Sequence, residues 1–417
     1  MLLSNLVTSE RKIYKKIPVK GISFDSKRVK KNYIFFAIKG SATSGYKYIS
    51  DAILNGASAI ICDSRVKLKN YKIPVLIVDD VRKALSEACS KFYKKKPKHI
   101  TAVTGTNGKS SVANFFYQIL SLSSIRAASI GTLGIQSQKY HKKTNLTSMN
   151  PLSLHSNLQK LKEEKINHVV LEASSHGLKQ KRLDYLNINT GIFTNLSHDH
   201  LDYHKDMTSY LNAKMYLFKK LLKKNSKIIT DEENKEFKDI TKISKERKIK
   251  CITIGTSSGN IRVLQNSYKG KKQIVKVLIN SKVFEVKTSL IGYFQIKNLL
   301  MAILAASECG LKLKTIFNKI NNIKPVPGRL ECVASLKNNS EIIIDFAHTP
   351  DALKQSLIAL KKQFKKEIII VFGCGGERDK KKRYTMGEIS KTYCRKIFVT
   401  DDNPRTENAK KIRNEII

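Results

Sequence analysis

The segment Thr104-Gly105-Thr106-Asn107-Gly108-Lys109-Ser110-Ser111 is the strongest indicator of the fold in this chain of 417 residues. It follows an apolar run at 100–103 and precedes a helical pattern of apolar residues. Its glycines let the backbone turn tightly and aim N–H groups at phosphate oxygens, while the helix N-terminus and Lys109 add positive charge. The hydroxyl of Ser110 can reach a magnesium ion on a nucleotide. We predict a strand, a phosphate-binding loop and a helix rather than an ordinary turn, although Val103 replaces the first glycine of the general G-x-x-x-x-G-K-[ST] pattern.

Apolar runs and helical patterns alternate outward from this loop, which is typical of α/β proteins with mostly parallel sheets. A linker near Pro97 and the run Pro325-Val326-Pro327-Gly328 mark boundaries. We predict three α/β domains, at 1–97, 98–325 and 326–417. The central domain should contain a mostly parallel P-loop-type sheet. Extra strands at 250–287 should make this sheet mixed at one edge. The third domain should be Rossmann-like and incomplete. Expected strands lie at 34–38, 59–62, 75–78, 100–103, 168–171, 191–194, 341–345, 367–372 and 396–400, and expected helices at 81–93 and 295–309.

The chain is strongly basic, with 78 Lys and Arg against 34 Asp and Glu and a net charge of +44. Such a charge suggests a nucleic acid or a membrane surface as partner. However, the lysines are scattered in short runs such as 94–96 and 380–382, without a long basic tail. We therefore expect a solvated coat and no nucleic-acid partner. An anionic, phosphate-rich small substrate also fits this charge.

The cysteines and the apolar segments bear on the compartment. The seven cysteines are isolated, odd in number and form no C-x-x-C pair, which argues for a reducing compartment. Residues 1–20 lack the long apolar region of a signal peptide, and no apolar run is long enough to cross a bilayer. We expect a cytoplasmic protein without membrane insertion.

Glu172 is the second chemical signal. It follows the apolar pair Val169-Val170 at the expected end of a strand. Open α/β sheets place ligands at the carboxyl ends of their strands, so Glu172 would lie near the phosphate loop and can hold a metal. The alternative is a carboxylate exposed at the surface.

A dense polar cluster at 194–204 is the third signal. It contains His198, His200 and His204 with two aspartates, a set that can bind a divalent metal. Lys214 follows ten residues after His204 on an expected helix. An ordinary solvated lysine is an equal alternative for Lys214.

Together these motifs resemble the Mur ligases. The resemblance covers nearly the whole chain in the expected order. Its motifs are DSKRV at 25–29, FAIKG at 36–40, GTNGKS at 105–110, EASSH at 172–176, TNLSHDHLDYH at 194–204, Ala213-Lys214, PGRLE at 327–331, DFAHTPD at 345–351, FGCGGERD at 372–379 and DNPR at 402–405.

The resemblance implies a cytoplasmic, monomeric enzyme of peptidoglycan precursor synthesis that uses ATP and Mg²⁺. Its reaction joins meso-2,6-diaminopimelate to the D-Glu of UDP-N-acetylmuramoyl-L-Ala-D-Glu through an acyl phosphate. Arg405 favours diaminopimelate, because a guanidinium pairs two-pronged with a carboxylate. L-lysine in place of diaminopimelate is the alternative amine.

The resemblance also assigns roles to individual residues. The catalytic residues it implies are Lys109, Glu172, His200 and Lys214, and Lys214 would be carbamylated to N6-carboxylysine. The expected metal ligands are Ser110, Glu172 and His200. ATP-binding positions are Gly105, Thr106, Asn107, Gly108, Lys109, Ser110, Ser111, Asn298, Arg329, Asp345 and His348. Substrate-binding positions are Ser26, Thr147, Ser148, Ser175, Gln180, Arg182, Arg378, Asp402, Asn403 and Arg405.

Some positions depart from the family pattern. Met149 follows Thr147-Ser148 where proline is usual, and Lys27 stands where arginine is common. The chain ends at Ile417, whereas the family continues through strands and helices that complete the amino-acid pocket. We therefore expect this chain to bind the nucleotide substrate but to turn over poorly or not at all.

Two other enzyme classes were weighed. A folylpolyglutamate-type ligase shares the nucleotide loop, but the separate N-terminal unit and the Asp402-Asn403-Pro404-Arg405 motif disfavour it. A metallo-hydrolase fits His198-x-His200-x-Asp202, but Tyr203 stands where that motif wants histidine and the Gly-Lys-Ser loop has no role in it.

Overall fold

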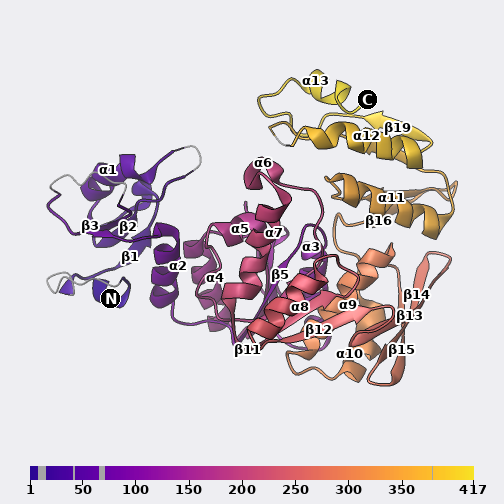
Figure 1. Ribbon diagram of the computed structural model, residues 1–417, viewed down its shortest axis with the longest axis horizontal. Helices are drawn as coiled ribbons and strands as arrows, with labels where there is room; N and C mark the ends of the chain where they lie inside the picture. Colours follow the sequence, from indigo (N-terminus) through magenta and orange to yellow (C-terminus); the bar gives the residue numbers. More distant parts are fainter. Residues whose placement is uncertain (8–15, 41–42, 65–70, 378) are drawn as a thin grey trace. The chain divides into compact units, whose positions relative to one another are not determined.

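The computed structural model describes residues 1–7, 16–40, 43–64, 71–377 and 379–417, and Figure 1 labels its elements. The chain forms two compact units. The first comprises residues 1–98, 148–167 and 176–187, and the second comprises 99–147, 168–175 and 188–417. Two segments expected in the central domain thus belong to the first unit, and the domain boundaries at 97 and 325 stay predictions. No described helix is both long enough and apolar enough to span a bilayer.

A four-stranded parallel sheet in the order β1-β2-β3-β4 forms the centre of the first unit. Successive residues of β2 face opposite sides, because side chains alternate along a strand. Ile34 and Phe36 pack into one apolar cluster, and Phe35 packs with Ile49 into another. The sheet is therefore buried on both faces, as parallel sheets are. The elements are η1 Leu3–Asn5, β1 Gly21–Ser23, η3 Ser26–Arg28, β2 Tyr33–Phe36, η4 Gly45–Tyr48, α1 Ile49–Leu54, β3 Ala57–Cys62, β4 Val75–Ile77, α2 Val81–Phe92, α4 Pro151–Glu163 and most of α5 Ser175–Lys179.

The second unit is built around an eleven-stranded sheet in the order β15-β14-β13-β12-β11-β10-β5-β9-β6-β7-β8. Its middle strands, from β13 to β6 in that order, pair in parallel. The strands are β5 His99–Thr104, β6 Ala127–Gly131, β7 Gly134–Ser137, β8 His141–Lys142, β9 His168–Glu172, β10 Ile188–Phe193, β11 Leu222–Asp231, β12 Lys250–Gly255, β13 Ile261–Lys269, β14 Lys272–Ile279 and β15 Lys282–Thr288.

Antiparallel pairs occur at both edges of this sheet, whereas we predicted a mixed sheet at one edge only. The expected edge holds β13, β14 and β15, and the unexpected one holds β6, β7 and β8. Tight turns cause this arrangement, since a two-residue loop can join only antiparallel strands. Asn280 and Ser281 both have positive φ between β14 and β15, which is the geometry that hairpin turns favour.

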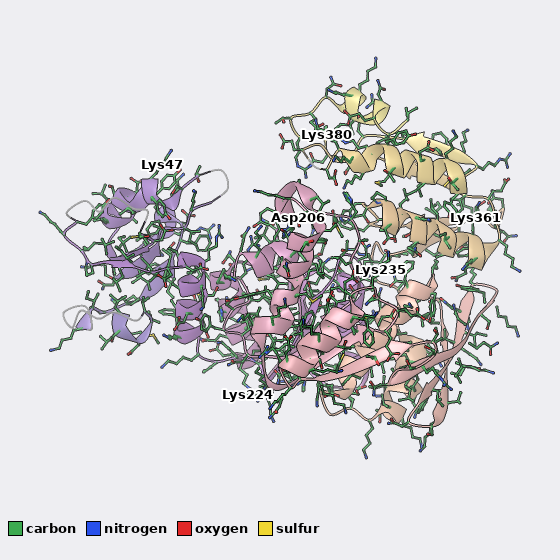
Figure 2. All side chains as sticks on the ribbon, viewed as in Figure 1. Lys47, Asp206, Lys224, Lys235, Lys361 and Lys380 are labelled. Carbon is green, nitrogen blue, oxygen red and sulfur yellow. The ribbon has the colours of Figure 1, made fainter. Side chains whose placement is uncertain are left out.

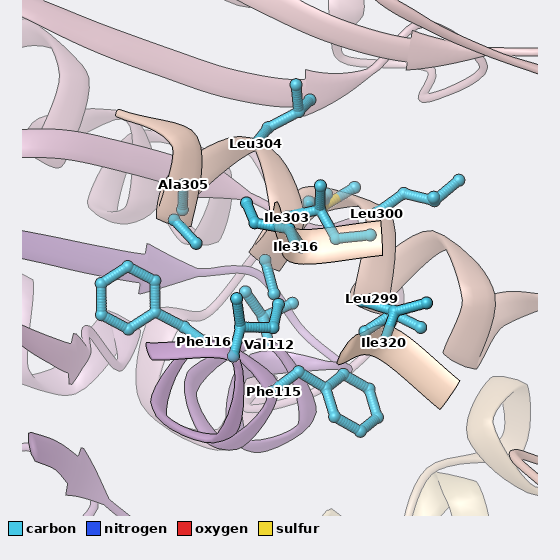
Figure 3. Packing of buried hydrophobic residues seen from close by; sticks show 14 of the residues in the cluster. Val112, Phe115, Phe116, Leu299, Leu300, Ile303, Leu304, Ala305, Ile316 and Ile320 are labelled. Carbon is cyan, nitrogen blue, oxygen red and sulfur yellow. The ribbon is translucent and has the colours of Figure 1, made fainter. Parts of the chain in front are cut away.

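Helix α3 Lys109–Leu122 packs against α9 Tyr293–Ser307, and Figure 3 shows the side chains between them. Phe115, Phe116 and Leu299 are fully buried in the same large apolar cluster. This packing anchors the helix whose first residue is Lys109, and thereby the loop before it. The other helices of this part are α6 Leu201–His204, α7 Met207–Tyr216, the π-helix η5 Leu217–Leu221, α8 Phe237–Glu246, α10 Leu313–Lys319 and the 3₁₀ turn η6 Ile320–Asn322.

The remainder of the second unit contains two two-stranded sheets and three helices. Strands β16 and β17 pair antiparallel, and β18 and β19 pair in parallel. Helices α11 and α12 pack together. The bounds are β16 Glu331–Ser335, β17 Glu341–Ile344, α11 Pro350–Phe364, β18 Ile369–Phe372, α12 Lys381–Tyr393, β19 Lys396–Val399 and α13 Ala409–Asn414.

The lysines are spread over both units. Figure 2 labels Lys47 in the first unit and Lys224, Lys235, Lys361 and Lys380 on separate elements of the second, and all five are exposed. This distribution agrees with the expected solvated coat. The absence of a nucleic-acid partner stays a prediction.

Candidate active site

The predicted phosphate loop joins β5 to α3. Gly108 is the N-cap of α3, has a φ of 86° and leaves the first turn without a side-chain cap. Gly105 has a φ of 146°, and a Cβ there would lie 1.8 Å from Oγ1 of Thr194. Asn195 Oδ1 accepts a 3.0 Å hydrogen bond from the backbone N–H of Asn107. The loop therefore needs both glycines, and it offers an uncapped helix N-terminus that suits an anion.

Lys109 lies folded over this loop. Its Nζ donates hydrogen bonds to the carbonyl oxygens of Gly105 at 3.0 Å and Thr106 at 2.7 Å. Burial lowers the pKa of Lys109, and the nearby carboxylates of Glu172 and Asp199 act in the opposite direction. An anion bound at the loop would favour the charged ammonium in the same way as these carboxylates.

Glu172 ends β9 and is buried, so the alternative of a surface carboxylate is wrong. Its carboxylate accepts hydrogen bonds from Ser110 Oγ at 3.0 Å and from the backbone N–H of Thr132 at 2.8 Å. Arg329 Nη2 lies 3.2 Å from the same Ser110 Oγ. A hydroxyl and a carboxylate side by side are the hard oxygen ligands that Mg²⁺ prefers, so these residues fit that ion.

The polar cluster at 194–204 does not converge on one point. His198 Nε2 lies 2.7 Å from Asp379 Oδ2, whereas His200 Nε2 lies 3.3 Å from Asp199 Oδ2. His204 Nε2 lies 2.9 Å from the hydroxyl of Ser175. Within the described ranges, no group of three His, Cys, Asp or Glu side chains could hold a metal ion. The structure therefore does not bring together the metal set that the spacing suggested.

Asp199 has an unusual charge environment. Burial alone would raise its pKa, but the nearby positive charges of His348, His200 and Lys382 bring the pKa well below its ordinary value. His348 Nε2 lies 3.8 Å from Asp199 Oδ2. Asp199 was not among the predicted site residues, although its position between two histidines was a usable signal.

Lys214 is buried at the end of α7, so the alternative of a solvated lysine is wrong. Its Nζ donates a 2.6 Å hydrogen bond to the carbonyl of Gly105 and lies 4.2 Å from the centre of the Tyr210 ring. Burial, reinforced by the charge of Lys109, lowers the pKa of Lys214 well below its ordinary value. A lysine in this environment favours the neutral, nucleophilic amine.

Tyr210 is a site residue that the sequence reasoning missed. Its hydroxyl lies 3.2 Å from Oγ1 of Thr106, and the residue is almost fully buried. The ring also packs near those of His200 and His204. The signal was its position four residues before Lys214, which places both side chains on one face of a helix.

A cavity of about 830 Å³ in the second unit brings most of the predicted residues together. Its lining includes the following predicted positions: Thr106, Asn107, Gly108, Lys109, Ser110, Ser111, Thr147, Glu172, Ser175, His200, Lys214, Asn298, Arg329, Asp345, His348, Asp402 and Arg405.

The other predicted positions lie elsewhere. Gly105 and Asn403 are not part of the cavity lining; Gly105 accepts a hydrogen bond from the lining residue Lys214, and Asn403 accepts one from the backbone N–H of Gly376. Arg378 lies outside the described residues. Four positions belong to the first unit: Ser26, Ser148, Gln180 and Arg182. There Arg182 donates to the carbonyl of Ser148 at 2.6 Å and to Oε1 of Gln180 at 2.7 Å.

Comparison with known proteins identifies the family. A Rickettsia conorii protein named UDP-N-acetylmuramoyl-L-alanyl-D-glutamate–2,6-diaminopimelate ligase is 41% identical over 98% of this chain and 85% of its own length. A Brucella melitensis protein of the same name is 37% identical over 96% of this chain and 82% of its own length. The chain belongs to the Mur ligase family.

Family profiles agree with this assignment along the chain. The Mur ligase family catalytic domain matches residues 18–93, the Mur ligase middle domain 103–306 and the Mur ligase glutamate ligase domain 328–417. A solved structure of a UDP-N-acetylmuramoyl-L-alanyl-D-glutamate–2,6-diaminopimelate ligase superimposes with a TM-score of 0.77 at 27% identity and covers 100% of this chain and 85% of that one. The expected α/β fold and the expected ATP-dependent carbon–nitrogen ligase are thereby confirmed.

The alternative of a folylpolyglutamate-type ligase shares only the fold. A structure titled as an FPGS–AMPPCP–folate complex has a TM-score of 0.60 at 15% identity and covers 73% of this chain and 80% of that one. The Mur ligase assignment therefore rests on sequence identity as well as on fold, whereas the likeness to the folylpolyglutamate-type ligase rests on fold alone.

Proposed function

We propose that this chain joins meso-2,6-diaminopimelate to the D-Glu carboxylate of UDP-N-acetylmuramoyl-L-Ala-D-Glu at the expense of ATP, in cytoplasmic peptidoglycan precursor synthesis. One observation carries the proposal. A single cavity is lined by the phosphate loop with Lys109 and, from the 373–405 region, by Asp402 and Arg405. The relatives named for this reaction supply the substrates.

The chemistry proceeds in two steps. The γ-phosphoryl group of ATP passes to an oxygen of the D-Glu carboxylate, which gives an acyl phosphate and ADP. The amine of diaminopimelate then attacks the carbonyl carbon, loses a proton and expels inorganic phosphate, which keeps the former carboxylate oxygen. Phosphoryl transfer needs positioning and charge neutralisation more than covalent help from the protein.

Lys109 and the first turn of α3 supply that neutralisation at the phosphates, because an ammonium and backbone N–H groups face the same space. Ser110, Glu172 and His200 would hold Mg²⁺, which supplies further positive charge at the transferring phosphoryl group. Arg329, anchored to the Ser110 hydroxyl, orients the same side of the loop.

Lys214 would act as a carbamate. Its buried neutral amine can add to carbon dioxide and release one proton, which converts the amine into a negatively charged, carboxylate-like ligand. The support is its burial and its place in the cavity lining beside the Gly105 carbonyl. A ¹³C resonance that appears with labelled bicarbonate in the wild type and disappears in Lys214→Ala would test this assignment.

Arg405 and Asp402 are proposed to bind the amino acid, together with Arg378 and Asn403. A guanidinium can pair with the distal carboxylate of diaminopimelate, whereas the ammonium group of lysine would be repelled by it. The dipeptide end of the nucleotide substrate is assigned to Thr147 and Ser175. Its remaining binding positions, in the first unit, are Ser26, Ser148, Gln180 and Arg182.

Phosphate release from ATP tests the proposal. We expect release only when the UDP-muramoyl dipeptide and meso-diaminopimelate are both present. Release that continues after either substrate is omitted would contradict the proposed reaction. Sedimentation of the active protein would test the expected monomer.

A further inference from the structure

Arg383 in α12 is the largest fully buried side chain of the described chain. Its guanidinium forms a fork with Glu407, with Nη1 at 3.0 Å from Oε2 and Nη2 at 3.2 Å from Oε1. Nη1 also lies 2.6 Å from Oε2 of Glu415, and Nη2 donates to the carbonyl of Gly375 at 3.2 Å. One buried cation therefore connects α12 with two separate loops and with α13.

Glu407 links those two loops by hydrogen bonds to both Arg383 and the backbone of Glu377. Its carboxylate accepts a hydrogen bond from the backbone N–H of Glu377 while it holds Arg383. Lys380 adds a longer ion pair to the same carboxylate, at 3.6 Å. Segments 373–377 and 401–407, which we call the paired loops, are thus joined through charged side chains that do not line the cavity.

The paired loops also touch directly. The backbone N–H of Gly376 donates to the carbonyl of Asn403 at 2.8 Å, and the Arg405 guanidinium donates to the carbonyl of Gly376. A Cβ on Gly376 would lie 1.9 Å from the carbonyl oxygen of Pro404, so no side chain fits between the loops. The position of Arg405 therefore depends on how the two loops lie against each other.

We propose that Arg383 is a positioning residue for the amino-acid side of the cavity. Both paired loops line the cavity, through Gly375 on one and Arg405 on the other, whereas Arg383 and Glu407 are absent from the lining. Arg383 acts through Glu407 and Gly375, and it keeps Arg405 in the place where a substrate carboxylate can reach it. The assignment to an amino-acid pocket rests on the proposed function.

Glu407→Gln and Glu415→Gln form a matched pair of test variants. Both remove a carboxylate that contacts Arg383, but only Glu407 belongs to the paired loops. We expect Glu407→Gln to raise the KM for diaminopimelate about tenfold while the KM for ATP stays within about twofold, as for a lost binding contact. We expect Glu415→Gln to leave both KM values unchanged.

A merely structural salt-bridge cluster predicts another outcome. Both variants would then lower the amount of folded enzyme and leave every KM alone, or would change all KM values together, and either result overturns the proposal. Arg383→Lys keeps the charge but loses the fork, so we expect it to resemble Glu407→Gln.

Hydrogen exchange supplies a readout that needs no turnover. We expect Glu407→Gln to speed amide exchange about tenfold in both paired loops, and Glu415→Gln to speed it only in α13. Unchanged exchange in the paired loops of Glu407→Gln overturns the proposal. A wild type without diaminopimelate-dependent phosphate release contradicts the proposed function instead, and the exchange result then decides the role of Arg383 by itself.

Discussion

The Nζ of Lys214 donates a 2.6 Å hydrogen bond to the carbonyl oxygen of Gly105, 109 residues away in the chain. This bond joins the end of α7 to the start of the phosphate loop. Since Lys109 donates to the same carbonyl, the side chains of two lysines converge on one backbone oxygen. Such a site destabilises the fold but suits chemistry, because burial and the charge of Lys109 lower the pKa of Lys214.

Lys214→Met should therefore stabilise the protein while it abolishes activity. The folded pKa of Lys214 lies well below its ordinary value because of burial and Lys109. Between these two pKa values the unfolded state holds a proton that the folded state lacks, so stability rises with pH across that window in the wild type. We expect the free energy of unfolding to be about 1–2 kcal/mol higher in the variant at neutral pH, because replacing a residue that is kept for function often stabilises a protein. Thermal unfolding at pH 7 and pH 9 checks this. A variant less stable than the wild type at both values would contradict the expectation.

Gly108→Ala should weaken ATP binding about tenfold or more, since a left-handed residue at a phosphate loop tolerates a side chain poorly. Its φ is 86°, and the new Cβ would lie 2.5 Å from Oδ1 of Asn298. Gly310→Ala is the matched control, because Gly310 has a φ of 92° but no atom within 4 Å of its Cβ position. The control should lose stability but bind ATP normally. Calorimetric titration of both variants with ATP measures the difference, and equal ATP affinities would remove the role given to Gly108.

Glu172→Gln should lower kcat about a hundredfold and increase the Mg²⁺ concentration needed for half-maximal rate, because the carboxylate proposed to bind the metal is lost. The NH₂ group of the glutamine would also face one of the two groups that now donate a hydrogen bond to Glu172, either Ser110 Oγ or the Thr132 N–H. Glu285→Gln on β15, where Glu285 pairs with Lys287 at 3.2 Å, is the control. Magnesium titrations of phosphate release decide the outcome. An unchanged magnesium requirement in Glu172→Gln would show that this carboxylate does not hold the ion.

The local motif and its flanking elements could be predicted from the sequence because their signals are local. The apolar run before Gly105 and the helical pattern after Lys109 became β5 and α3 within a residue or two. By contrast, the second antiparallel edge depends on β7 and β8, which are short and carry few apolar residues. Nothing in their pattern distinguishes them from a loop.

The candidate site was predictable by residue type more than by arrangement. The spacing of His198, His200 and His204 suggested one metal cluster, yet the three side chains have three different partners. His200, with a φ of 55°, is the N-cap of α6, His204 is the last residue of that helix and His198 precedes it, so no single helix face presents all three side chains. The burial of Lys214 was equally hidden, because a buried lysine and a solvated one look alike in a sequence.

His155 in α4 should make the first unit sensitive to acid. The side chain is fully buried, neither ring nitrogen has a hydrogen-bond partner among the described residues, and burial lowers its pKa to about 3. Below the unfolded pKa near 6.5 the unfolded state binds a proton that the folded state refuses, so stability falls as the pH falls through that window. We expect the wild type to lose about 2 kcal/mol more than His155→Leu between pH 7.5 and pH 5.

Urea unfolding at the two pH values measures this loss. The exposed His141 on β8 provides the control, and His141→Leu should lose as much stability in acid as the wild type. If His155→Leu shows the same acid loss as the wild type, the buried histidine does not account for the pH dependence.

The central claim is the ligation of diaminopimelate, and mass spectrometry of the product tests it most directly. The protein is incubated with ATP, Mg²⁺, UDP-N-acetylmuramoyl-L-Ala-D-Glu and equal amounts of meso-diaminopimelate and L-lysine. We predict a new nucleotide-linked tripeptide with the mass of the diaminopimelate adduct, together with ADP and phosphate. A product that carries lysine in place of diaminopimelate would contradict the account.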